Sequence, residues 1–515
     1  MGALDRLPVE MLCAILDELT LSDVRNLRLV NRAIGEVASS IAFKDVWFIL
    51  RKNDFDMVRA IANNPSCAAH TTRLAYLVHM FNHQRETLAQ FAQVIRQYED
   101  VHARRYKLRP DLFATPKPKK TDAEIQDYYR RYVRLYEEQE EILSNDHDFA
   151  LMEEVVSKFP NLRSILVEDD SYFDSTEFRA AGPRFVVRSM VASDDNFDFG
   201  DDLTDAYSGV QDDRAAATTR NLRAVLKGVE KAGIQLQSIH TGALQIEILD
   251  KKQFGLHSMP PRLLENLTTL NLMLLAVGER TDVEASSGML EHAPMVAYAR
   301  SHLARCRALT RRATLRQTLE KMPNLVDLSI ELLEMAGRPS KPSWQMPWDL
   351  PSPAFLKDVI LVDRFWPKLK RLVIKNVETD HPELLAFLVR HKASLETLKL
   401  DNIRLTSTSW RSLLPDMKAQ FRHSRCIREM VFMGFVLGVE QDTGLVESWY
   451  LGNADEAPKN RCPIGRAVIR YLMSDDGEES FPLHIGNMFP DYPHRPFKED
   501  IGDLDEDEDK DDDIE

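Results

Sequence analysis

The chain has 515 residues, 44% of them hydrophobic, and a formal net charge of −15. This length and apolar content suffice for a large buried core in two to four structural units. The sequence has no run of eighteen apolar residues and does not begin with the apolar core of a signal peptide, so we expect no membrane partner and a cytoplasmic or nuclear location. The acidic balance also argues against nucleic acid as a partner.

The first fifty residues carry apolar side chains at helical spacing. Four of them recur three or four residues apart after Pro8, a residue that suits the first turn of a helix: Leu12, Ile15, Leu16 and Leu19. Thr20 and Asp23 predict the start of a second helix, and the apolar pattern continues to Ile41. We therefore predict a first helix followed by two more, or by one broken helix. Their apolar surface exceeds what they can bury among themselves, which is typical of a docking module.

Five short elements follow one another in this segment: Leu7-Pro8-x-Glu10, Ile15-Leu16-x-x-Leu19, Asp23-Val24-x-x-Leu27, Leu29-Val30-Asn31-Arg32 and Phe43 to Trp47. Together they resemble the F-box, over roughly a tenth of the chain. In that family the module binds the small adaptor subunit of cullin-based, SCF-type ubiquitin ligases, and the rest of the chain recruits the protein to be ubiquitylated. The resemblance implies a scaffold that is not an enzyme and that needs no cofactor.

The resemblance also assigns residues to the family's adaptor-facing and core motif positions. They are Leu7, Pro8, Ile15, Leu16, Leu19, Leu27, Val30 and Arg32. The segment departs from the family pattern at Asn31, where many members carry Cys, and at Ala33 and Ile34, where a longer apolar residue is common. The alternative interpretation is an N-terminal helical cap on a larger domain, with similar periodicity but without these motifs together.

Residues 51–158 are predicted to form a helical connector. Thr72 to Tyr106 and Asp122 to Lys158 both follow helical spacing. Between them, residues 109–121 contain three prolines and three lysines, which indicates a solvent-exposed linker. After the connector, residues 169–213 are rich in Asp, Ser, Gly and Asn, and we expect an irregular insertion with one short strand at Phe185 to Val187.

A leucine pattern of the form L-x-x-L-x-L/I begins at Leu162 and returns along the chain. The clear copies start at Leu264 or Leu267, Leu325, Leu369 and Leu395, and Leu236 and Ile427 begin degenerate copies. Residues Pro382 to His391 and Ser407 to Phe421 are predicted helices between strands. In a leucine-rich repeat, the apolar positions of each strand face a shared core that neighbouring repeats complete. The spacing of 26 residues from Leu369 to Leu395 fits such a repeat, whereas 44 residues from Leu325 to Leu369 do not.

The usual asparagine after the strand is missing from most copies, although Asn376 and Asn402 lie close to its place. An ordinary α/β domain with buried strands therefore stays open as an alternative. Proteins with an F-box often carry leucine-rich repeats as their substrate-binding part. This chain resembles the divergent kind found in many fungal sequences.

No catalytic constellation stands out in the sequence. His79 and His83 are four residues apart, but no third metal ligand is indicated, so we predict no metal site. The acidic group Glu137, Glu138, Glu140 and Glu141 is expected to be a solvated helix face. The five cysteines, Cys13, Cys67, Cys306, Cys426 and Cys462, show no paired spacing, and we expect reduced thiols. Exposed aromatic side chains often anchor partners, so Trp344, Trp348 and Phe355 are possible target-binding residues.

The fold class predicted is a multidomain α+β protein: a three-helix F-box at 1–50, a helical connector at 51–158, and an irregular α/β leucine-rich-repeat-like solenoid at 159–455. A loosely ordered acidic segment at 456–515 follows, because Asp503 to Glu515 holds ten acidic residues and one lysine. The function predicted is substrate recognition in an SCF-type ligase, with the adaptor subunit, through it the cullin, and an unknown target as partners. The alternative is a free-standing repeat scaffold without a ligase role.

Overall fold

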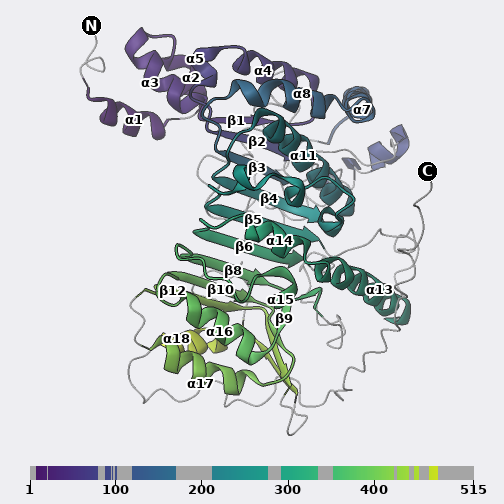
Figure 1. Cartoon of the computed structure of the whole chain (residues 1–515). Helices are drawn as coiled ribbons and strands as arrows, with labels where there is room; N and C mark the ends of the chain where they lie inside the picture. Colours follow the sequence, from purple (N-terminus) through teal and green to yellow (C-terminus); the bar gives the residue numbers. More distant parts are fainter. Residues whose placement is uncertain are drawn as a thin grey trace, which may run out of the picture. The chain divides into compact units, whose positions relative to one another are not determined.

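The computed structural model describes residues 7–19, 21–78, 87–93, 95–96, 99–100, 119–169, 211–275, 292–333, 352–422, 426–439, 446–451 and 463–473. The chain forms two compact units. The first comprises residues 1–275 and 320–329, and the second comprises residues 276–319 and 330–515. Figure 1 labels the helices and strands of both units.

Three short helices open the first unit: α1 (Val9–Asp17), α2 (Leu21–Leu27) and α3 (Arg32–Ala42). The chain therefore breaks between α2 and α3, which settles the two alternatives that the periodicity left open. Thr20, the predicted cap of the second helix, lies outside the described residues.

Parallel strands follow these helices in the first unit. They are β1 (Asp45–Phe48), β2 (Arg73–Val78), β3 (Ser164–Asp169), β4 (Ser238–Gln245) and β5 (Thr269–Leu275). Each strand pairs with the next one along the chain, and all four pairings are parallel. This order needs a crossover between every two strands, and helices supply it.

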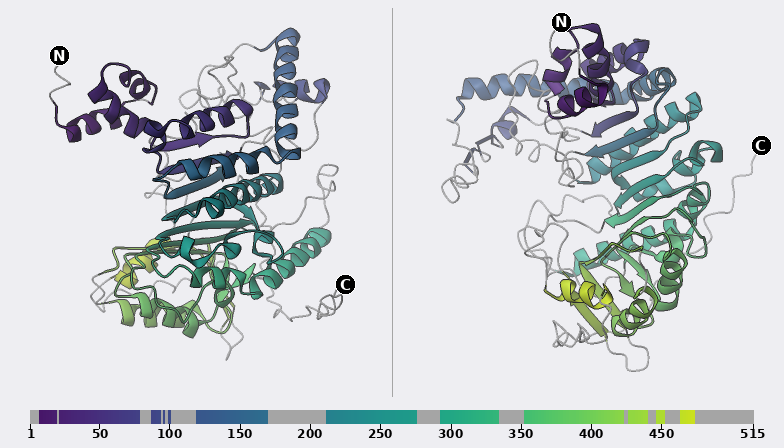
Figure 2. Two further views of the ribbon diagram at one scale, coloured as in Figure 1. Left: turned by 45° about the horizontal axis from the view of Figure 1, so that its top comes forward. Right: turned by 90° about the vertical axis from the view of Figure 1, so that its left-hand side faces the viewer.

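Helices α4 (Lys52–Ala62), α8 (His147–Val155) and α11 (Gln211–Ala232) cover one face of this sheet (Figure 2). Shorter pieces complete the unit: α5 (Pro65–Ala68), α12 (Pro261–Leu264), and the 3-10 turns η2 (Val156–Lys158), η4 (Ile246–Leu249) and η5 (Leu256–Ser258). Arg220 of α11 holds the carboxylate of the fully buried Asp148 in α8 through two bonds of 2.9 Å, which fixes these two helices to each other.

The leucine pattern forms the core layer of the sheet. Within one copy, Leu162 precedes β3, and Ile165 and Val167 follow inside it, and all three side chains are buried. The strand register places Ile165 beside Leu74 on one side and Ile239 on the other. Apolar side chains of successive strands thus lie in rows on one face, as period-two alternation requires.

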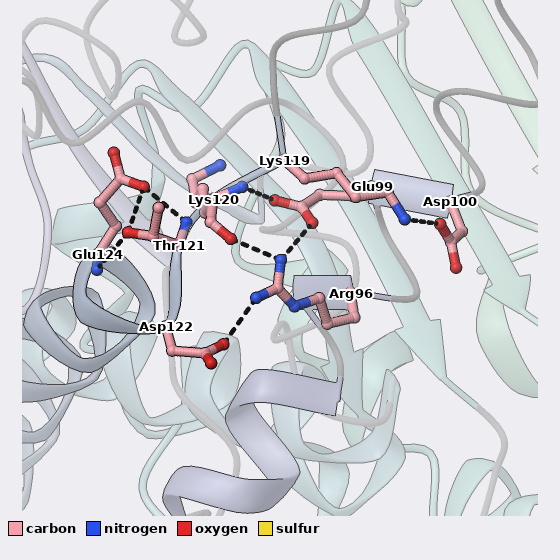
Figure 3. Close-up of polar contacts among 8 residues, drawn as sticks. All are labelled: Arg96, Glu99, Asp100, Lys119, Lys120, Thr121, Asp122 and Glu124. Carbon is pink, nitrogen blue, oxygen red and sulfur yellow. Dashed lines mark hydrogen bonds and ion pairs between the residues drawn. The ribbon is translucent and has the colours of Figure 1, made fainter.

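Helix α7 (Asp122–Ser144) packs on a helical segment within residues 88–100 through a small aromatic core of its own. Phe91 and Tyr132 lie 5.2 Å apart at its centre. Figure 3 shows the polar cluster at the end of this pair of helices. Arg96 donates to the Asp122 carboxylate at 2.8 Å, and Lys119 donates to Asp100 at 2.7 Å. These contacts hold residues 119–122 against residues 96–100.

The second unit contains two sets of strands joined by helices. Its first set is β8 (Arg371–Lys375), β10 (Thr397–Asp401) and β12 (Glu429–Met433), which are parallel neighbours in that order. Its second set has the order β14 (Val446–Tyr450), β13 (Phe435–Val439), β11 (Arg404–Leu405), β9 (Val377–Thr379) and β7 (Ala354–Phe355). Among the described strands of the second unit, only β14 runs antiparallel to its neighbour.

The helices of the second unit are α13 (His292–Arg311), α15 (Leu356–Val359), α16 (His381–His391), α17 (Trp410–Phe421) and α18 (Pro463–Met473). Helices α16 and α17 confirm the two helices predicted between strands. Helix α14 (Thr314–Glu320) and strand β6 (Asp327–Leu333) lie where the chain passes from one unit to the other.

Three of the sequence expectations need correction. The helix predicted from Thr72 is wrong at its start, because residues 73–78 form the strand β2. The side chains on both faces of this strand are buried. The segment predicted as loosely ordered from 456 contains α18, whose Val468 and Leu472 are buried against the second unit. Residues 211–213, predicted as irregular insertion, belong to α11. The predicted strand at 185–187, most of the linker at 109–121, and the acidic residues 503–515 lie outside the described residues.

Candidate docking surface

The core of the first three helices is formed by small and medium apolar side chains. Leu16 of α1 and Val24 of α2 are buried against Ala38 and Ala42 of α3. Half-buried Leu27, Val37, Ile41 and Phe43 surround them. Alanines four residues apart on α3 let the other two helices approach closely, so a stable three-helix unit forms from few residues.

Glycine at position 35 sets the distance between α2 and α3. A Cβ atom placed on Gly35 would lie 2.8 Å from the backbone oxygen of Arg28, so any side chain there would push the helices apart. The Arg28 side chain completes this contact, since its Nε donates to the Ser39 hydroxyl at 3.0 Å and its guanidinium lies 4.2 Å from the centre of the Phe43 ring.

Asn31 explains where the third helix begins. Its side-chain oxygen accepts a hydrogen bond of 2.9 Å from the backbone N–H of Ile34, which satisfies one of the free donors of the first turn. The segment departs from the F-box pattern at this position, but asparagine caps the helix well. The start of α3 is thus defined by local hydrogen bonding.

Exposed apolar side chains gather on the first helix and on the following turn. Val9, Met11 and Ile15 lie on α1, and Leu19 follows Ile15 after four residues, just beyond the end of the helix. We call these four residues the α1 patch. Leu29 and Val30, between α2 and α3, are 85% and 62% exposed, and we call them the turn patch.

This concentration is unusual within the molecule. Nine large hydrophobic side chains are exposed among the described residues, and six of them belong to the α1 patch and the turn patch. Soluble proteins rarely leave large apolar side chains clustered in water unless a partner covers them. The arrangement therefore indicates a protein-binding surface on the first three helices.

The structure divides the residues assigned from the sequence into two groups. Leu16 is buried and Leu27 half-buried in the helical core, so they support the surface from beneath. Pro8, Ile15, Leu19, Val30 and Arg32 are exposed, and Leu7 is half-buried. Sequence reasoning missed Val9, Met11 and Leu29. The spacing of four residues between Met11 and Ile15 was the signal that could have identified the first of these additions.

The third helix leads into the first strand without a break. Lys44 follows α3 directly, and its carbonyl accepts hydrogen bonds from the N–H groups of Thr72 and Arg73 at 2.9 and 3.1 Å. The Arg73 guanidinium also pairs with Asp45 and lies over the Trp47 ring. No separate linker therefore lies between α3 and β1.

The other sites considered in the sequence show no feature of a binding or catalytic site among the described residues. Glu138 and Glu141 of α7 bind the backbone N–H and ammonium of Lys52, and the hydrogen bond from Lys52 lowers the pKa of Glu141, as expected for a surface ion pair. His79 and His83 lie outside the described residues. Within the described ranges, no group of three His, Cys, Asp or Glu side chains is placed to hold a metal, and no helix is long and apolar enough to cross a membrane.

Of the three possible target-binding aromatic residues, the structure describes only Phe355. Trp344 and Trp348 lie outside the described residues. Phe355 is half-buried in β7, and its ring is approached by Arg307 at 4.6 Å, Lys357 at 5.6 Å and Arg311 at 5.9 Å. Cations of the chain itself therefore gather around this ring, and its role in target binding stays a prediction.

Comparison with known families agrees with this geometry. Residues 4–45 match the family model of the F-box domain, a range that covers α1, α2 and α3 and ends where β1 begins. The chain therefore contains an F-box domain in its first 45 residues. F-box domains bind the small adaptor subunit of SCF complexes, and the domain is typical of substrate adaptors of this ligase class in general. Comparison with curated proteins gives no match.

Proposed function

We propose that this chain is a non-catalytic substrate-recognition subunit of an SCF-type, cullin-based ubiquitin ligase. In this proposal the α1 patch and the turn patch dock on the adaptor subunit, which connects the chain to the cullin. The observation that carries it is the cluster of exposed apolar side chains within the matched F-box domain. Burying several such side chains against a partner is worth about 1.5–3 kcal/mol each.

We further propose that the strands after the F-box form an irregular leucine-rich-repeat-like domain that binds the target. A recurring backbone arrangement supports this idea. One carbonyl before each strand accepts two successive N–H groups of the next strand, and this occurs at Lys44, Thr72, Arg163, Gln237 and Thr268 in the first unit and at Lys370 and Glu396 in the second. Repetition of one hydrogen-bonding arrangement is typical of stacked repeats.

The test is binding of the full-length chain to the recombinant adaptor subunit, with and without its cullin. Two variants probe the surface: Ile15→Ala/Leu19→Ala in the α1 patch and Leu29→Ala/Val30→Ala in the turn patch. Leu88→Ala, which truncates an exposed apolar residue outside the F-box, is the matched control. We expect each double variant to weaken adaptor binding at least tenfold, because hot-spot truncations cost about 2 kcal/mol or more.

The alternative function, a free-standing repeat scaffold, makes the opposite prediction. A folded wild-type chain that does not bind the adaptor subunit would refute the ligase proposal. A chain that binds the adaptor but excludes the cullin would also contradict it. Circular dichroism of each variant, compared with the wild type, distinguishes a loss of binding from unfolding.

A further inference from the structure

A group of cations in the first unit has almost no acidic partners. Arg223 and Lys227 lie four residues apart on one face of α11. The loop at 250–259 contacts both of them: Arg223 donates to the Gln253 side chain, and the Lys227 ammonium lies 3.8 Å from the centre of the Phe254 ring. The exposed residues Lys251 and Lys252 belong to the same loop.

A fifth cation, Lys321, also contacts this loop. Lys321 donates to the backbone carbonyls of His257 and Met259 at 2.6 and 3.0 Å. The His257 ring is hydrogen-bonded to backbone groups of Lys251 and Gln253, and the Gln253 side chain accepts the bond from Arg223. Gln253 thus links Arg223 of α11 to His257, whose carbonyl accepts a hydrogen bond from Lys321.

The charges of this group are largely uncompensated. Lys227 pairs with Glu230 at 3.3 Å, but among the residues that the structure describes no carboxylate forms an ion pair with Arg223, Lys251, Lys252 or Lys321. Burial lowers the pKa of both Arg223 and Lys321. A half-buried cation without a counter-charge destabilises the free protein, and an anionic ligand would remove that cost.

One covered donor supports the same conclusion. Arg223 Nε is buried without a hydrogen-bond partner among the described residues. Buried polar atoms are normally satisfied, so this unsatisfied donor indicates a missing acceptor. The cations follow the loop and the helix instead of converging on one point, which fits a run of carboxylates better than one phosphate ion.

We propose that α11 and the loop at 250–259 form a docking surface for an acidic peptide segment of a partner protein. The surface consists of Arg223, Lys227, Lys251, Lys252 and Lys321. This inference rests on the proposed function: the target that the substrate receptor binds would carry the acidic segment. It places that contact on the helical side of the first unit, apart from the F-box patches.

The test is fluorescence anisotropy of the full-length chain with a labelled peptide of twelve glutamates, and with the glutamine peptide of equal length. We expect the glutamate peptide to bind and to weaken as salt rises from about 0.05 M to 0.3 M, since salt screens exposed charges. The triple variant Lys227→Gln/Lys251→Gln/Lys252→Gln should bind it about tenfold more weakly, because each exposed charge contributes modestly.

The control variant Lys158→Gln/Lys368→Gln/Lys392→Gln removes three positive charges away from α11 and the loop, and should bind the glutamate peptide like the wild type. Equal loss in both variants, or equal binding of the glutamine peptide, would refute the docking surface. Tighter binding of a twelve-nucleotide single-stranded DNA would refute an acidic peptide as the occupant. Adaptor binding should be unchanged in the triple variant, so failure here and failure of the ligase proposal are distinguishable.

Discussion

Two neighbouring residues of α1 have opposite environments. Leu16 is 2% exposed in the core of the three helices, whereas Ile15 is 40% exposed on the α1 patch. Replacing Leu16 with Ala should therefore destabilise the F-box by about 2–5 kcal/mol through the cavity it leaves. Ile15→Ala should change stability by at most about 0.5 kcal/mol. Thermal unfolding of the two variants measures this difference, and equal stability would contradict the assignment of Leu16 to the core.

Residue spacing alone could not make this distinction. The spacing of Ile15, Leu16 and Leu19 predicts that they share one apolar face. Only part of that face contacts α2 and α3. Which edge of the face is covered depends on the approach of α3, which Gly35 and Ala38 allow. The sequence predicted an apolar excess, and the tertiary packing decided which side chains form it.

His391 at the end of α16 should make the second unit sensitive to acid. Its Nδ1 donates to the Phe387 carbonyl at 2.9 Å, and its Nε2 accepts the Trp366 N–H at 3.1 Å, so both nitrogens suit the neutral ring. Burial lowers the pKa of His391 below its ordinary value of 6.5. The folded state then holds fewer protons than the unfolded state, so stability from this group is present above pH 6.5 and is lost as pH falls.

Hydrogen exchange of the α16 amides, measured between about pH 7 and pH 5 and corrected for the intrinsic rate, checks this expectation. We expect the protection of wild-type α16 to fall toward pH 5 and the fall to be smaller in His391→Gln. Glu383 of the same helix acts in the opposite sense, because burial raises its pKa to about 7. The comparison therefore uses the difference between the two proteins, with Glu383 unchanged in both. Identical pH dependence would contradict the role of His391.

Asp54 at the start of α4 is a buried carboxylate whose effect on stability changes with pH in the opposite direction to that of His391. Burial raises its pKa from 3.8 to about 6, although its oxygen accepts the Ile49 N–H at 2.9 Å. The folded state binds the extra proton between these values, so this contribution to stability falls as pH rises through that window. Asp54→Asn keeps the acceptor and should stabilise the first unit by about 2–3 kcal/mol above pH 6. Urea unfolding at pH 7 and pH 4 tests this, since the gain should vanish at the lower pH.

Three equivalent corners shape the second unit. Asn376, Asn402 and Gly434 follow β8, β10 and β12, and all three have positive φ angles. Each corner turns the chain from the first set of strands into the second set, at β9, β11 and β13. Asn376 also donates its side-chain amide to the carbonyl of Leu332. The asparagine positions noticed in the sequence thus have a structural role that the repeat spacing alone did not reveal.

Substitutions at Asn376 separate its two contributions. Asn376→Gly keeps the positive φ at no steric cost but loses the bond to Leu332. Asn376→Ala loses the same bond and also places a Cβ atom in the unfavourable left-handed conformation. We expect both variants to be destabilised, with Ala about 1 kcal/mol worse than Gly because of the left-handed conformation. Chemical denaturation provides the measurement. An alanine variant as stable as the glycine variant would show that the backbone conformation costs nothing here.

The β2 element shows where sequence periodicity fails. Leu74, Leu77 and Val78 have the spacing of a helix, but all of residues 74–78 are buried in a strand between β1 and β3. A strand buried on both faces reads as a continuous apolar run, and periodicity does not distinguish such a run from a buried helix. Pairing with strands far away in the sequence decided the outcome.

At the scale of the whole molecule, the F-box and the strands share a boundary without a linker. The matched domain ends at residue 45, where β1 begins. Phe48 of β1 is fully buried and its ring stacks on Tyr76 of β2 at 4.4 Å. Removing residues 1–50 therefore takes away a strand together with the F-box. The expected domain limit of 50 stays a prediction, but the contacts favour an earlier cut.

Two truncated chains test this boundary. A chain that lacks residues 1–43 keeps β1, whereas a chain that lacks residues 1–50 exposes β2 and loses the Phe48 side chain. We expect a lower melting temperature for the second, since losing a buried aromatic side chain costs about 3–5 kcal/mol. Both chains should fail to bind the adaptor subunit. Equal melting temperatures would show that β1 contributes little to the first unit.

The sequence by itself determined the F-box segment and the strand positions of the leucine pattern. Both depend on local spacing: apolar residues three or four apart form a helix face, and L-x-x-L-x-L places alternate side chains of a strand in the core. Only the tertiary structure decided that β2 is a strand, that Val468 and Leu472 of α18 are buried, and that Leu16 lies in the core of the three helices while Ile15 is exposed. These outcomes depend on contacts between distant segments, and spacing along the chain does not record such contacts.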